Sequence, residues 1–188
     1  LREEGLQPGT ALDLPSLRIY ADYLSRGIAV AAMGASDAHS LADIGCGMSG
    51  LEIDGPLSKA AVVAAIRGLR TFATTEAGIR LRCTLDPESA RLRWQLDWQP
   101  RDPVAGTSFV VEAYRGSELL DRASAESGSV AASGDGLYWV AALGERGLAV
   151  SSPVGRAREP ARAEAVLSQE SIDDLVRMRM RRRWAGWG

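Results

Sequence analysis

The chain has 188 residues, of which 46% are hydrophobic, and its formal net charge is −2. Such a chain can bury a real core in one or two globular domains, and its weak net charge excludes a strong overall attraction to nucleic acid or to an anionic membrane. No apolar run reaches the roughly 18 residues that a membrane-spanning helix needs.

Residues 16–75 are predicted to alternate helices and short strands. Leu17 to Leu24 show helical spacing between a candidate N-cap, Ser16, and a stop at Gly27. The apolar run 27–34 (GIAVAAMG) predicts a strand buried on both faces, as in a parallel sheet. A glycine-rich loop, a helix over 56–69 capped by Ser58, and a strand over 70–76 (RTFATTE) follow. This order is the repeating unit of an α/β layer or barrel.

Residues 79–154 have a different pattern, with seven short segments separated by Pro, Gly, Asp or Ser. The clearest segment is RLRWQLDW, in which Leu92, Trp94, Leu96 and Trp98 alternate with polar residues. Strands at this spacing predict an antiparallel β-sandwich.

Residues 155–188 are predicted to form a linker and a basic C-terminal helix. Ser171 is a candidate cap, Asp173 and Asp174 lie at the positive end of this helix, and arginines lie at its negative end. Packing of this helix on a partner or on the sandwich is favoured over nucleic-acid binding, because no wider basic surface accompanies it. The predicted domains are therefore 1–78, 79–154 and 155–188.

The sequence MGASDAHS places Asp37 two residues before His39, the only histidine in the chain. From spacing alone, a helix cap and a structural histidine are the simpler interpretation. A carboxylate and an imidazole at the end of a strand can nevertheless bind the same divalent cation. Asp37 and His39 are therefore the candidate metal ligands, and the sequence assigns no catalytic residue.

This motif and the residues after it resemble the last metal-ligand motif of the PHP (polymerase and histidinol phosphatase) superfamily of metal-dependent hydrolases. The similarity runs through GIAVAAMGASDAHSLADIG and SKAAVVAAIRGLRTFATTE, and it is closest to the carbaryl-hydrolase-like branch, in which a β-rich domain follows the barrel. The resemblance implies the last β/α units of a distorted (β/α)7 barrel. It also implies two or three divalent ions (Zn, Mn or Fe) and hydrolysis of a phosphoester or ester by metal-activated water.

The chain departs from this family in its ligand set. The family takes its other ligands from an early His-x-His pair, further histidines and a glutamate, whereas this chain has no second histidine. Four carboxylates could add oxygen ligands, but each is more simply a solvated surface group: Asp43, Glu52, Asp54 and Glu76. We therefore expect only the C-terminal portion of such a hydrolase, incomplete as a catalyst without the missing N-terminal barrel segment.

Two other groups of residues invite a functional interpretation. The hydroxyls of Thr71, Thr74 and Thr75 could bind a phosphate, although β-propensity alone explains threonine in a strand. Cys46 lies between two glycines, but no base is available to activate its thiol. Cys46 and Cys83 are better explained as small buried residues than as a disulfide framework, with a single bridge left open.

Two functions remain as hypotheses. The first is the C-terminal portion of a PHP-type hydrolase, and the alternative is a non-catalytic β-sandwich binding or assembly module that carries a barrel remnant. The expected partners are a small phosphoester or ester and the missing barrel segment, with no membrane and with nucleic acid disfavoured. The first residue is leucine, which suggests a fragment or a processed product, and the absence of a charged-then-apolar leader favours a cytoplasmic location.

Overall fold

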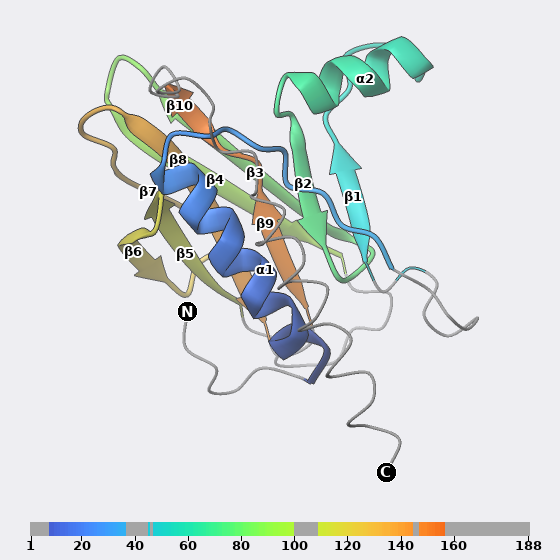
Figure 1. The fold of residues 1–188 in the computed structure, drawn as a ribbon, viewed down its shortest axis with the longest axis horizontal. Coiled ribbons are helices and arrows are strands. Elements are labelled where there is room, and N and C mark those ends of the chain that lie inside the picture. Colours follow the sequence, from blue (N-terminus) through green and yellow to red (C-terminus); the bar gives the residue numbers. More distant parts are fainter. Residues whose placement is uncertain (1–7, 37–44, 46, 100–108, 145–146, 157–188) are drawn as a thin grey trace, which may run out of the picture. The chain divides into compact units, whose positions relative to one another are not determined.

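The fold is taken from a computed structural model, which describes residues 8–36, 45, 47–99, 109–144 and 147–156. Side chains are described from residue 16 onward. Within these residues the chain forms two helices and ten strands (Figure 1). The predicted C-terminal helix lies outside the described residues.

The first helix, α1 (Pro8–Ser25), includes the predicted segment and begins earlier than Ser16. It ends at a turn in which Gly27 has a φ of 78°, a conformation that glycine adopts without strain. Its buried residues Leu17, Ala21 and Leu24 recur at helical spacing and form its core-facing stripe.

The second helix, α2 (Lys59–Arg67), is confirmed together with its cap. The hydroxyl of Ser58 accepts a hydrogen bond from the Ala61 amide at 3.1 Å, and Gly68 follows the last residue of the helix. Because α2 buries little more than Ala65, it depends on this cap and on its neighbours more than a core helix does.

The strands form two antiparallel sheets. The larger sheet has the order β1-β2-β9-β8-β5-β6, with β10 also paired to β8, and the smaller has the order β3-β4-β7. The bounds of the strands are β1 (Met48–Leu51), β2 (Thr71–Thr74), β3 (Ile79–Asp86), β4 (Arg91–Trp98), β5 (Phe109–Arg115), β6 (Glu118–Ala123), β7 (Ser127–Ala131), β8 (Gly136–Gly144), β9 (Leu148–Ser151) and β10 (Val154–Arg156).

Side-chain alternation in the strands divides the interior into two cores. Leu92, Trp94 and Leu96 of β4 pack against Tyr138 and Val140 of β8, so the two sheets face each other across the first core. The intervening residues of β8, Trp139 and Ala141, point the other way and pack under α1 in the second core. Strand β8 is therefore buried on both faces, which explains its nearly continuous apolar sequence.

Trp139 is the centre of the second core. It is fully buried, stacks on Tyr114 with ring centroids 4.5 Å apart, and meets Tyr20 of α1 edge-on at 5.3 Å. Its indole N–H donates to the backbone carbonyl of Gly116 at 2.7 Å, so the polar atom of this large side chain is satisfied. These contacts fix α1 against the larger sheet.

The predicted barrel units are wrong. Strand β2 pairs antiparallel with β1 on one side and with β9 on the other, so the described residues contain antiparallel sheets and no (β/α) barrel. The apolar run 27–34 is not a strand either, and it crosses from α1 toward β1 without pairing in a ladder. A strand of a parallel sheet requires at least one parallel neighbour, and the described part of this chain offers the run none.

Candidate functional site

The predicted ligands Asp37 and His39, together with Asp43 and Cys46, lie outside the described residues. The segments on either side of them are described, and they show how this part of the chain is attached to the fold. We call residues 28–36 the strap, because this extended segment lies against the larger sheet and leads directly to Asp37.

Side-chain hydroxyls, rather than a strand ladder, attach the strap to the sheet. The amide of Ala32 donates to the Ser152 hydroxyl at 2.9 Å, and the Ala32 carbonyl accepts from the Thr71 hydroxyl at 2.8 Å. The two hydroxyl oxygens are 2.7 Å apart, and all three residues are buried. The amide and the carbonyl of one strap residue are thus both satisfied by a pair of hydroxyls beneath it.

Ser49 of β1 makes a second attachment two residues further along. Its hydroxyl accepts from the Gly34 amide at 3.0 Å and donates to the Gly34 carbonyl at 2.9 Å. Ala32 and Gly34 are alternate residues of an extended chain and therefore face the same side. The strap is consequently held at two alternate residues shortly before the Asp-x-His motif.

Close backbone contacts hold together the two ends of the segment that carries the motif. A Cβ atom added to Gly34 would lie 2.5 Å from the carbonyl oxygen of Met48, and one added to Gly47 would lie 2.5 Å from that of Ala35. Only glycine permits an approach this close. Residues 34–36 and 47–49 therefore form a tight base from which the chain leaves with Asp37 and to which it returns by Gly47.

The threonine hydroxyls considered as phosphate ligands, and judged more simply to be ordinary strand residues, are all engaged within the protein. Thr71 holds the strap, Thr74 bonds the backbone of Glu76 at 3.1 and 3.2 Å, and Thr75 accepts from the Leu148 amide at 2.9 Å. Their hydrogen bonds are structural, so the interpretation as ordinary strand residues accounts for them.

Two of the carboxylates considered as extra ligands form ion pairs. Glu52 accepts from Arg82 at 2.8 Å, and Asp54 accepts from Arg70 at 2.5 Å. The hydrogen bond and charge of Glu52 also raise the pKa of Arg82. Glu76 differs, because one of its carboxylate oxygens is buried without a hydrogen-bond partner.

A groove of about 540 Å³ opens between the two sheets beside the strap attachment. Phe72, Leu81 and Val154 line it with apolar surface, and Cys83 also faces it. Burial raises the pKa of the Cys83 thiol to about 12, against the opposing effect of a hydrogen bond with Ser151. The thiol is therefore protonated near neutral pH and is a poor nucleophile.

Among the described residues, no group of three or more His, Cys, Asp or Glu side chains could hold a metal ion. Searches of protein-family models, curated proteins and solved structures find no match to the chain. Neither described helix is long and apolar enough to cross a membrane.

Sequence reasoning missed Ser49 and Ser152 as residues of this region, and it explained Thr71 by β-propensity alone. All three are small hydroxyl residues in or beside short strands of the larger sheet. Serine and threonine are common at such positions, so the sequence does not mark them as functional. The apolar run 27–34 was the feature that could have pointed to these hydroxyls. Its buried backbone N–H and C=O groups need hydrogen-bond partners, and side-chain hydroxyls can supply them where no strand does.

Proposed function

We propose that this chain contributes Asp37 and His39 as ligands to the metal centre of a PHP-type hydrolase, and that the remaining ligands come from outside this chain. The observation that carries the proposal is the tight base formed by residues 34–36 and 47–49 on either side of the motif. An anchored base reduces the entropy lost when a loop orders its ligands around an ion.

The order of elements around the motif also supports this function. The apolar run precedes the motif, and the capped helix α2 and strand β2 follow it in the order of the resemblance, although the run is not a strand and β1 lies between the motif and α2. The pairing of these elements differs from the family barrel, so the support comes from the motif and its anchoring rather than from the fold.

The donor set present in the chain suits a divalent cation but does not complete a hydrolytic centre. One carboxylate and one imidazole fit zinc, manganese or iron equally well. The sequence has a single histidine and the described residues hold no ligand cluster, so the proposal takes the remaining ligands of a centre of two or three ions from outside this chain. A metal bound there would polarise a phosphoester or ester and lower the pKa of a bound water.

The metal content of the purified chain tests the proposal. Elemental mass spectrometry after equilibration with zinc, manganese or iron is expected to find bound metal that is lost in Asp37→Ala and in His39→Ala. Asp22→Ala is the matched control, since this exposed carboxylate on α1 pairs with Arg26 far from the motif in sequence. Equal metal in all four proteins would contradict a ligand role for the motif, and no metal in any of them would mean that the motif binds metal only with the ligands supplied from outside this chain.

A non-catalytic binding module is the second candidate. The described residues favour it in one respect, because their strands form two antiparallel sheets in place of the barrel that the resemblance implies. Turnover separates the candidates. When the missing ligands are supplied on a longer chain, the hydrolase gains metal-dependent activity on a chromogenic phosphoester or ester, whereas a binding module gains none.

A further inference from the structure

The exposed face of α2 has an unusual composition for the surface of a protein. Helical spacing divides α2 into two faces, and the inner face includes Ala65, which is fully buried. A shallow, open depression of about 620 Å³ lies on the opposite face and is lined by five residues: Lys59, Ala60, Val63, Ala64 and Arg67. The three residues between the two basic ones are apolar, so this face lacks the polar side chains that usually cover an exposed helix.

Apolar surface continues beyond the start of the helix. Leu57 directly precedes the cap residue Ser58 and is 79% exposed, and Val63 in the middle of the face is 37% exposed. An apolar residue before an N-cap commonly packs against its own helix, but Leu57 does not bury itself in this way. Leu57 and Val63 therefore give α2 apolar surface that the rest of the fold leaves uncovered.

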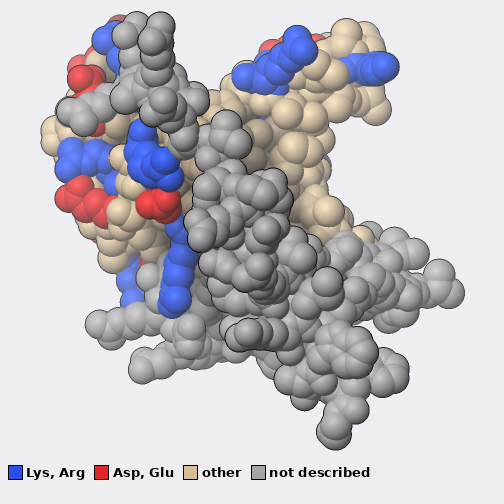
Figure 2. All heavy atoms as spheres, in the orientation of Figure 1, with Lys and Arg blue, Asp and Glu red and all other residues tan. Residues whose placement is uncertain are grey.

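Basic residues without carboxylate partners lie at the two ends of this face. Lys59 is in the first turn and Arg67 in the last, and α2 contains no acidic residue. Among the described residues, no carboxylate lies within ion-pair distance of either one, and Asp54 nearby in the sequence is held by Arg70 at 2.5 Å. Figure 2 shows basic side chains toward both ends of α2, at the upper right, with mostly uncharged surface between them.

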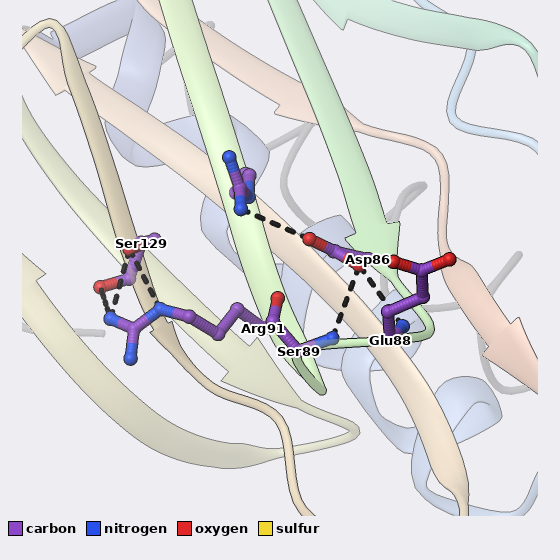
Figure 3. A network of polar contacts seen from close by, with 6 residues as sticks. Asp86, Glu88, Ser89, Arg91 and Ser129 are labelled. Atoms are coloured by element: carbon purple, nitrogen blue, oxygen red, sulfur yellow. Dashed lines mark hydrogen bonds and ion pairs between the residues drawn. The ribbon is translucent and has the colours of Figure 1, made fainter.

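The arginines of the smaller sheet differ in this respect, because carboxylates accompany them. Arg93 pairs with Asp86 at 3.0 Å, and the register places Arg91 directly across from the same aspartate. The hydroxyl and the carbonyl of Ser129 also hold the Arg91 guanidinium at 2.9 to 3.0 Å (Figure 3). The charges of α2 have neither kind of compensation within the described part of the chain.

We propose that the exposed face of α2 docks a partner helix whose apolar stripe carries a carboxylate near each end. The middle of α2 uses its backbone groups within the helix, so it offers no edge for strand pairing, and a segment packed on it must satisfy its own backbone. Ala60 and Ala64 are one turn apart and leave room for the close approach of a second helix. Lys59 and Arg67 are about 12 Å apart along the axis, so the matching carboxylates are about eight residues apart on the partner.

Charge argues against a second copy of α2 as this partner. Antiparallel packing would place Lys59 of one copy beside Arg67 of the other, and parallel packing would place identical cations together. A lipid bilayer also fits poorly, because this nine-residue helix presents only Val63 as a large apolar side chain on the face.

Binding of a labelled helical peptide to the full chain tests this inference. The peptide has alanine and leucine along one face and a glutamate near each end at the spacing given above, and a matched peptide has lysines in place of the glutamates. Fluorescence anisotropy is expected to show binding of the glutamate peptide that weakens as salt is added, and no binding of the lysine peptide. Lys59→Ala with Arg67→Ala should weaken binding about tenfold, because two exposed charge pairs are lost. Arg80→Ala with Arg91→Ala is the matched control and should leave binding unchanged.

Two further variants separate binding from any loss of fold. Val63→Gln removes the apolar contact without weakening the helix, because glutamine favours helices more than valine does, and it should also weaken binding about tenfold. Leu119→Gln, at an exposed leucine of β6, is its control and should bind normally. Lys59→Glu with Arg67→Glu should lose the glutamate peptide and bind the lysine peptide in its place.

Three results would overturn the inference. The first is equal binding of the two peptides, or no binding of either at millimolar concentration. The second is binding of phosphatidylserine vesicles that Val63→Gln abolishes, and the third is a dimer in sedimentation that the same substitution dissociates. None of these results concerns the metal ligands, so the inference can fail while the proposed function stands.

Discussion

The hydroxyl oxygens of Thr71 and Ser152, which are 81 residues apart in the sequence, lie 2.7 Å from each other beneath the strap. Each also bonds one backbone group of Ala32. A single buried hydroxyl pair thus joins the start of β2, the end of β9 and the segment that leads to Asp37.

Removing either hydroxyl should destabilise the fold. Thr71→Val and Ser152→Ala each leave a buried backbone group of Ala32 unsatisfied, which costs about 1–3 kcal/mol. Because the two hydroxyls share one network, the double variant should lose less than the sum of the single losses. Urea denaturation of the four proteins measures this coupling, and Thr84→Val on the exposed face of β3 is the control. Strict additivity would contradict a shared network.

The base of the motif-bearing segment should not tolerate a methyl group. Gly47→Ala places a Cβ atom 2.5 Å from the Ala35 carbonyl oxygen, so the backbone must move, at a cost of about 1–3 kcal/mol. If the base orders the ligands, this variant also loses bound metal, which elemental mass spectrometry would detect. Gly55→Asn is the control, because Gly55 has open space around it and asparagine tolerates its φ of 81°. If a folded Gly47→Ala protein keeps its metal content, the base does not order the metal ligands.

The Cys83 thiol should be slow to alkylate in the folded protein. With its pKa raised to about 12, only a very small thiolate fraction exists at pH 8. Iodoacetamide labelling in a Cys46→Ala background should be much slower in buffer than in urea. Fast labelling in buffer would contradict the raised pKa of the Cys83 thiol.

The same thiol gives a signed dependence of stability on pH. Between about pH 9 and pH 12 the unfolded chain loses the Cys83 proton while the folded chain keeps it, so the free energy of unfolding should fall as pH rises. In the Cys46→Ala background, Cys83→Ala should remove this part of the dependence. An identical pH profile for the two proteins would rule out the assigned contribution of Cys83.

Loss of the N-cap of α2 should lower the free energy of unfolding by about 1 kcal/mol. Ser58→Ala removes the acceptor for the Ala61 amide at a helix start, where such a loss typically costs that much. Thermal unfolding followed by circular dichroism compares it with Ser124→Ala, an exposed serine outside the helices. Equal melting temperatures for the two variants would show that α2 does not need its cap.

Local patterns predicted the elements that depend on local chemistry. The alternation of Leu92, Trp94 and Leu96 identified a strand with one buried face, and Ser58 identified the start of α2. In contrast, Met48–Leu51 was not predicted as a strand, because its serine and glycine hide the usual β signal.

The sequence pattern did not reveal which strand or side chain pairs with the backbone of each segment. The run GIAVAAMG has the composition of a buried parallel strand, but composition does not say what satisfies its backbone, and here hydroxyls do so at Ala32 and Gly34. The run RTFATTE was correctly predicted as a strand, yet its neighbour β9 lies more than 70 residues later. The barrel was wrong because it assumed that neighbours in sequence are parallel neighbours in space.

The place of β2 between β1 and β9 sets an order of events during synthesis. Until residues 148–152 have left the ribosome, β2 has one open edge, Tyr20 of α1 has no carbonyl of Ser151 to bind, and the strap has no Ser152 beneath it. The first elements of the chain must therefore wait for residues made much later, as expected of a domain that folds as a unit. A chain that ends at residue 147 would contain every element up to β8, but β2, α1 and the strap would lack the contacts that residues 148–152 supply.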